Sequence, residues 1–99
     1  MKKTYLVITD NSEETIIEEL LNIIPVRENE TILIFDNHST DNTVSEIIGT
    51  MGILWKWEDN YKFYINCKKK MDKEEIIERV KKIANGSLFL VEKGVKTEC

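Results

Sequence analysis

Two aspartates that follow apolar runs are the first candidates for chemistry in this sequence. Asp10 comes one residue after the run at 5–8, and Asp36 directly follows the run at 32–35. If these runs are neighbouring parallel strands, their carboxyl ends meet at one edge of a sheet and the two side chains lie side by side. Two carboxylates at one edge would be a plausible cradle for Mg²⁺ or Mn²⁺. The candidate catalytic and metal-binding residues are therefore Asp10 and Asp36.

A polar loop follows the second run and supplies candidate binding groups. Residues 36–43 read Asp-Asn-His-Ser-Thr-Asp-Asn-Thr. Asp, Asn, Ser and Thr also stabilise turns and cap helices, so the same loop has a purely structural interpretation. His38 is the only histidine, and one chain therefore cannot build a catalytic triad or a histidine metal site. The candidate binding residues in this loop are Asp36, Asn37, Ser39 and Asp41.

A run of three lysines in the second half of the chain is a candidate anion-binding site. Lys68, Lys69 and Lys70 are consecutive, and residues 51–99 hold eleven basic and eight acidic side chains, against three and ten in residues 1–50. Clustered lysines can contact phosphate, so a nucleic-acid partner is one alternative. Glutamates interleave with the basic residues that follow at helical spacing, which makes an ordinary solvated surface the other alternative.

The spacing of apolar residues predicts the elements that would position these candidates. Continuous apolar runs at 4–8 and 31–35, joined by a helical pattern that Pro25 ends, predict a parallel β-α-β unit. A second helical pattern follows the polar loop. Together these patterns place both aspartates at strand ends.

In the second half of the chain the pattern changes to alternation. Ile53, Trp55 and Trp57 occupy every second position, and large apolar residues recur in the same way at 61–65, which predicts an antiparallel hairpin with one aromatic face. A helix that begins after Asp72 and a final strand at 87–91 complete the elements. A thioredoxin-like order also fits these elements, although the redox C-x-x-C motif is missing.

The expected order is β-α-β-α-β-β-α-β, in a single domain over residues 1–99 with a flexible tail at 94–99. We expect an α/β fold, an α+β two-layer sandwich whose mixed five-stranded sheet carries helices mostly on one face. Residues 31–93 alone spell β-α-β-β-α-β, the order of a ferredoxin-like core. The sequence leaves open whether 4–24 or 31–50 is the accessory βα unit.

The polar loop at 36–43 resembles the D-[DN]-x-S-T-D-x-T loop that closes the second strand of inverting glycosyltransferases with the nucleotide-sugar fold. The resemblance covers about residues 4–48. In that family the aspartate at the strand end contacts the base and ribose of the sugar nucleotide, which implies this role for Asp36. The sequence lacks the family's D-x-D metal pair and its acceptor half. The resemblance therefore implies a degenerate sugar-nucleotide-binding domain.

Residues 50–93 resemble the small CRISPR-adaptation nuclease family and its non-CRISPR relatives. The shared pattern is a hairpin, a helix that opens with acidic residues, and a final apolar strand. The resemblance implies a ferredoxin-like fold and a metal-dependent nuclease whose key acid ends the first strand. Asp10 and Asp36 both fit that place. In the family, a symmetric dimer brings two such acids near one metal.

The cysteine content and the first residues of the sequence indicate the cellular compartment. Cys67 and Cys99 are the only cysteines, which is few for a small secreted domain. The apolar run near the start is too short for a signal peptide or a membrane span. We therefore expect a cytoplasmic protein without a membrane partner.

The incomplete set of catalytic groups favours a small non-catalytic binding or regulatory protein. It would act through protein–protein contacts or self-association, for example at an unpaired sheet edge, and would need no cofactor. The alternative is a nuclease-like ferredoxin-fold protein or a degenerate sugar-nucleotide-binding domain, either of which would use Mg²⁺ or Mn²⁺. Whether the protein is an enzyme stays open at this point.

Overall fold

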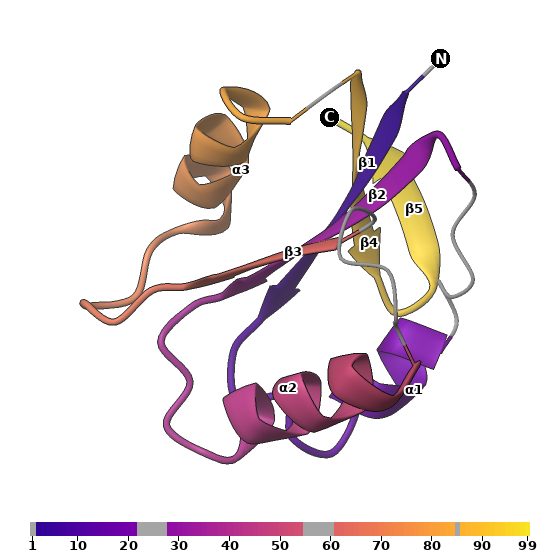
Figure 1. The fold of residues 1–99 in the computed structure, drawn as a ribbon. Coiled ribbons are helices and arrows are strands. Elements are labelled where there is room, and N and C mark those ends of the chain that lie inside the picture. The colour runs from indigo at the N-terminus through magenta and orange to yellow at the C-terminus, as the bar shows by residue number, and fades with distance from the viewer. Residues whose placement is uncertain (1, 22–27, 55–60, 85) are drawn as a thin grey trace.

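The computed structural model describes residues 2–21, 28–54, 61–84 and 86–99. These parts form a mixed five-stranded sheet and three helices, so the predicted α/β class is confirmed (Figure 1). In chain order the elements are β1 (Lys3–Thr9), α1 (Ile16–Leu21), β2 (Glu30–Asp36), α2 (Thr43–Leu54), β3 (Tyr61–Ile65), α3 (Lys73–Lys81), β4 (Ser87–Glu92) and β5 (Val95–Glu98).

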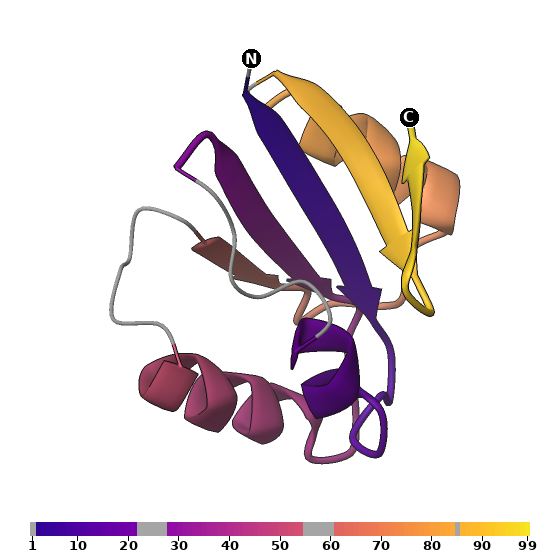
Figure 2. The ribbon, with the colours of Figure 1, turned by 90° about the vertical axis from the view of Figure 1, so that its right-hand side faces the viewer.

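The strand order is β3-β2-β1-β4-β5. The pairs β1–β2, β1–β4 and β2–β3 are parallel, and the pair β4–β5 is antiparallel. The apolar runs that predicted β1 and β2 form the middle of the sheet, where parallel strands are covered on both faces. Figure 2 shows β3 and β5 at the two outer edges.

Side chains that alternate along the central strands fill two separate cores. Tyr5 and Val7 of β1 pack with Ile16 of α1 and Ile47 of α2 on one face. Leu6 of β1 packs with buried residues of α3 on the other face. Two of the three helices share a face, as expected, but α3 adds a third layer, so the two-layer arrangement is corrected (Figure 1).

The ferredoxin-like order of residues 31–93 is also corrected. Ile53 and Leu54, expected in a strand, belong to α2, and residues 55–57 lie outside the described residues. β3 pairs in parallel with β2, and β1 separates β2 from β4. Both early βα units therefore belong to one continuous sheet, and neither is accessory. The error arose because a short alternating run does not show which strand will be its partner.

The C-terminal tail, expected to be flexible at 94–99, instead contributes β5. Glu92 pairs with Val95 across a two-residue turn, in which Lys93 and Gly94 have φ angles of 49° and 81°. Positive φ at both turn positions is the type I′ geometry that matches the twist of a hairpin. The tail therefore extends the sheet beyond β4.

Within the described residues, no helix has the length and apolar character needed to cross a membrane.

Candidate functional site

The loops after the parallel strands meet at one edge of the sheet, here called the carboxyl edge. The chain moves from β1 outward to β3, and α3 then returns it to β4 on the other side of β1. The strand order therefore reverses between β1 and β4. In open α/β sheets, ligands bind outside the carboxyl ends of the strands at such a reversal.

Asp36 lies at the carboxyl edge but is buried, with 1% of its surface exposed. Its Oδ1 accepts hydrogen bonds from the hydroxyls of Thr9 (2.7 Å) and Ser39 (2.6 Å). Its Oδ2 accepts one from the backbone N–H of Ser39 (3.0 Å). The parallel register places Thr9 opposite Asp36, which brings the Thr9 hydroxyl within hydrogen-bond distance of the Asp36 carboxylate. The Asp36 carboxylate therefore joins β1 to the loop after β2.

Asn11 connects the loop after β1 to the same polar loop. Its Oδ1 accepts from the backbone N–H groups of Thr40 (2.7 Å) and Asp41 (3.3 Å), and its own N–H donates to Ser39 Oγ (3.0 Å). Asn11 has a φ of 51°, in the left-handed region that asparagine tolerates better than most residues. Hydrogen bonds between side chains and backbone thus hold the two loops together.

Asp41 continues this network at the start of α2. Its carboxylate accepts from the N–H and hydroxyl of Thr43 and from the N–H of Glu13 (3.3 Å). The hydrogen bond from the Thr43 side chain is the main cause that lowers the pKa of Asp41. Thr43 Oγ1 in turn accepts from the N–H of Ser12 (2.7 Å). The Asp41 carboxylate therefore holds the two loops together.

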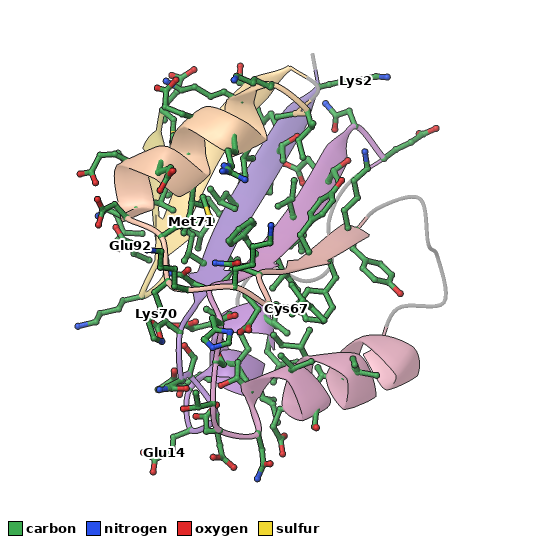
Figure 3. The ribbon with its side chains drawn as sticks, turned by 90° about the vertical axis from the view of Figure 1, so that its left-hand side faces the viewer. Lys2, Glu14, Cys67, Lys70, Met71 and Glu92 are labelled. Carbon is green, nitrogen blue, oxygen red and sulfur yellow. The ribbon has the colours of Figure 1, made fainter. Side chains whose placement is uncertain are left out.

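Asn37 fixes a third loop, residues 66–72, here called the lysine loop. Its Nδ2 donates to the Met71 carbonyl and its Oδ1 accepts from the Met71 N–H, both at 2.9 Å. Asn66 donates to the same Oδ1 (3.3 Å) and to the Lys69 carbonyl (3.0 Å). Asn37 is 6% exposed. A buried amide thus holds the lysine loop against the end of β2. Figure 3 labels Cys67, Lys70 and Met71 of this loop.

The lysine loop continues along the carboxyl edge toward β4. Lys70 forms an ion pair with Asp10 at the end of β1, and Lys73 lies 3.5 Å from Glu92 at the end of β4. Lys68 and Lys69 are exposed and make no ion pair in the described part of the chain. The edge therefore offers two uncompensated ammonium groups on an ordered loop.

The structure does not join Asp10 and Asp36 in a shared cradle. Their loops lie together as predicted, but Asp10 pairs with Lys70 while Asp36 accepts from Thr9 and Ser39. Among the described residues, no group of three or more His, Cys, Asp or Glu side chains could hold a metal ion. The described residues at this edge therefore offer binding groups rather than a set of metal ligands.

A hollow at the reversal between β1 and β4 was not predicted from the sequence. Its volume is about 390 Å³, and it is lined by Ile8, Glu19, Val91, Glu92 and Lys93. Burial, reinforced by the neighbouring Glu18, raises the pKa of Glu19, while Lys93 acts in the opposite direction. In sequence, Glu19 looks like any helix-surface glutamate, because its burial depends on the turn between β4 and β5.

In the described part of the chain, the three non-glycine residues with positive φ lie in loops that follow strands at the carboxyl edge. They are Asn11 after β1, His38 after β2 and Lys93 after β4, with φ angles of 51°, 58° and 49°. Such conformations carry a free-energy cost and cluster at functional sites. The Lys93 conformation belongs to the hairpin turn after β4, so Asn11 and His38 are the two that mark the loops after β1 and β2.

These features define the class of molecule: an α/β domain with a doubly wound sheet and a polar carboxyl edge. No known protein-family profile matches the sequence, and no curated protein matches it.

Proposed function

We propose that this chain is a non-catalytic binding domain that holds a sugar nucleotide at its carboxyl edge. The observation that carries the proposal is the reversal of strand order between β1 and β4. In doubly wound sheets, nucleotides bind outside the carboxyl ends of the strands at such a reversal. The resemblance of residues 36–43 to the glycosyltransferase loop supports a sugar nucleotide as the ligand.

The electrostatics of the lysine loop support an anionic ligand. Lys68 and Lys69 are exposed and unpaired within the described residues, and the Asn37 side chain orders the loop that carries them. Lysine ammonium groups bind phosphate as point charges. We therefore assign the phosphates of the ligand to Lys68 and Lys69.

We leave catalysis out of the proposal because the three aspartates at this edge are engaged in other contacts. Asp36 and Asp41 accept hydrogen bonds within the loops, and Asp10 pairs with Lys70. A general base needs a carboxylate within reach of the proton that it abstracts. The resemblance implied a direct contact between Asp36 and the base and ribose; we instead propose that Asp36 positions the loop.

Isothermal titration calorimetry with UDP-glucose, UDP and inorganic pyrophosphate tests this proposal. We expect the nucleotides to bind more tightly than pyrophosphate, without release of glucose or UDP over time. The variant Lys68→Ala/Lys69→Ala should weaken nucleotide binding by about tenfold or more, because it removes two charged contacts.

The matched control is Lys81→Ala/Lys82→Ala, which removes the same charge from the other end of α3 and should leave affinity nearly unchanged. Absence of nucleotide binding at millimolar concentration would overturn the proposal. Equal weakening by both double variants would also overturn it, because the lysine loop would then act only through net charge.

A further inference from the structure

The strand β5 presents an open edge whose sequence is complementary to itself. β5 pairs with β4 on one side, and all four of its residues are exposed. It is the last strand of the sheet, and no described strand pairs with its outer edge (Figure 2). An open edge of this kind is a template for pairing with another strand.

The hydrogen-bond pattern shows which residues of β5 face this edge. The Cys99 N–H donates to the Leu88 carbonyl of β4 (2.9 Å). In an antiparallel ladder the backbone groups of successive residues point to opposite sides. Val95, Thr97 and Cys99 therefore bond toward β4, and the N–H and C=O groups of Lys96 and Glu98 point outward.

We propose that a second copy of this chain docks antiparallel along β5, with a two-fold axis at Thr97. In this register Lys96 stands opposite the partner's Glu98, and Glu98 stands opposite the partner's Lys96. Both positions form hydrogen-bonded pairs, so the contact makes four backbone hydrogen bonds and two salt bridges. The two sheets become one continuous sheet across the axis.

Charge selects this register over its neighbours. An axis at Lys96 would place the two Lys96 ammonium groups opposite each other, and an axis at Glu98 would do the same with carboxylates. Like charges directly opposite in a sheet are destabilising. Only the axis at Thr97 leaves both charges compensated.

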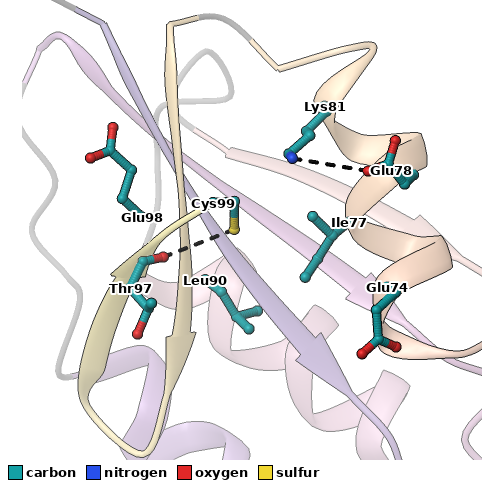
Figure 4. Close-up of a pocket in the computed structure, with 8 residues that line it drawn as sticks. All are labelled: Glu74, Ile77, Glu78, Lys81, Leu90, Thr97, Glu98 and Cys99. Carbon is teal, nitrogen blue, oxygen red and sulfur yellow. Dashed lines mark hydrogen bonds and ion pairs between the residues drawn. The ribbon is translucent and has the colours of Figure 1, made fainter.

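The face of β5 toward α3 gives a second reason for a copy of this chain as the occupant. Val95 is 64% exposed, and the register places it opposite the partner's Cys99. Beside Cys99 lies a hollow of about 350 Å³ between α3 and β5, with Ile77 and Leu90 among its lining residues (Figure 4). The partner's Val95 would therefore meet the rim of this hollow and lose its exposure to water.

Sedimentation equilibrium of the Cys99→Ser protein tests the pairing without an adventitious disulfide. A contact limited to one strand edge is small, so we expect a weak dimer, formed at high micromolar to millimolar concentration. Lys96→Glu and Glu98→Lys should each raise the dissociation constant at least about tenfold, because each places like charges opposite each other twice. Lys62→Glu, on the opposite edge strand β3, is the matched control and should leave the constant unchanged.

Mixing the two single variants distinguishes charge repulsion from a disruption of β5 by either substitution. One variant carries two acids and the other two lysines at these positions, so the mixture should form a heterodimer although neither variant dimerises alone. Circular dichroism confirms that each variant is folded. A monomeric wild type at millimolar concentration, or single variants that dimerise like the wild type, would overturn the proposal. Nucleotide binding at the carboxyl edge is measured separately and does not bear on this result.

Discussion

Asn37→Ala removes the buried amide that holds the lysine loop to the end of β2. The change deletes both hydrogen bonds to the Met71 backbone (2.9 Å each) and the longer one from Asn66 (3.3 Å). Each such bond contributes about 0.5–1.5 kcal/mol net, and backbone groups left without a partner add to the loss. Because Met71 is only partly buried, water recovers some of this loss. We expect a destabilisation of about 2–3 kcal/mol.

Urea denaturation measures the free energy of unfolding, and amide hydrogen exchange reports the Met71 N–H directly. Asn37→Ala should lower the denaturation midpoint and greatly speed exchange at Met71. Asn42→Ala is the matched control, since its side chain makes one exposed hydrogen bond, to Glu13 (3.0 Å), and should cost no more than about 0.5 kcal/mol. If Met71 exchanged at the same rate in both variants, the proposed role of Asn37 would be refuted.

Three further substitutions test other parts of the fold. Asp36→Asn presents an NH₂ group to a site where three donors converge, so urea denaturation should show a loss of about 2–3 kcal/mol; an unchanged midpoint would contradict the buried carboxylate. Gly86→Ala should cost about 1–3 kcal/mol, because φ is +77° and the new Cβ would lie 1.9 Å from the Lys2 carbonyl oxygen; neutral behaviour in thermal denaturation would disprove this approach. Glu19→Gln should raise Tm at neutral pH, since burial raises the pKa of Glu19. A raised carboxylate pKa means that the folded state binds the proton more tightly than the unfolded state. Wild-type stability therefore rises as the pH falls through the folded-state pKa of Glu19 toward the ordinary value of 4.5, and the advantage of the variant should disappear there. A difference in Tm that does not depend on pH would argue against burial as its cause.

Parts of the fold were predictable because they depend on local patterns. Continuous apolar runs located β1 and β2, and a helical stripe containing Ile76 and Val80 located α3, where both residues are buried. The partner of β3 was not predictable, because pairing is decided by contacts between segments distant in the sequence. Alternation in residues 61–65 fits a hairpin and a parallel edge strand equally well.

The candidate site divides in the same way. Residue types after β1 and β2 predicted polar loops at one edge, and the structure brings these loops together. The partner of each side chain was decided by tertiary structure: Asn37 binds Met71, 34 positions away in sequence, and Asp10 pairs with Lys70, 60 positions away. The expected cradle of Asp10 and Asp36 did not form because nearer donors compensate each carboxylate.

The sequence by itself determined the α/β class, the two central strands and the polar character of the loops that follow them. The reason is that the apolar pattern of a strand and the residue types of a turn are both contained in short segments. Only the tertiary structure decided the strand order, the placement of α3 on the second face and the addition of β5 to the sheet. The same strand order makes the lysine loop a border of the carboxyl edge and leaves β5 open. The physical reason is that hydrogen bonds between strands, and burial between layers, form only when distant segments meet.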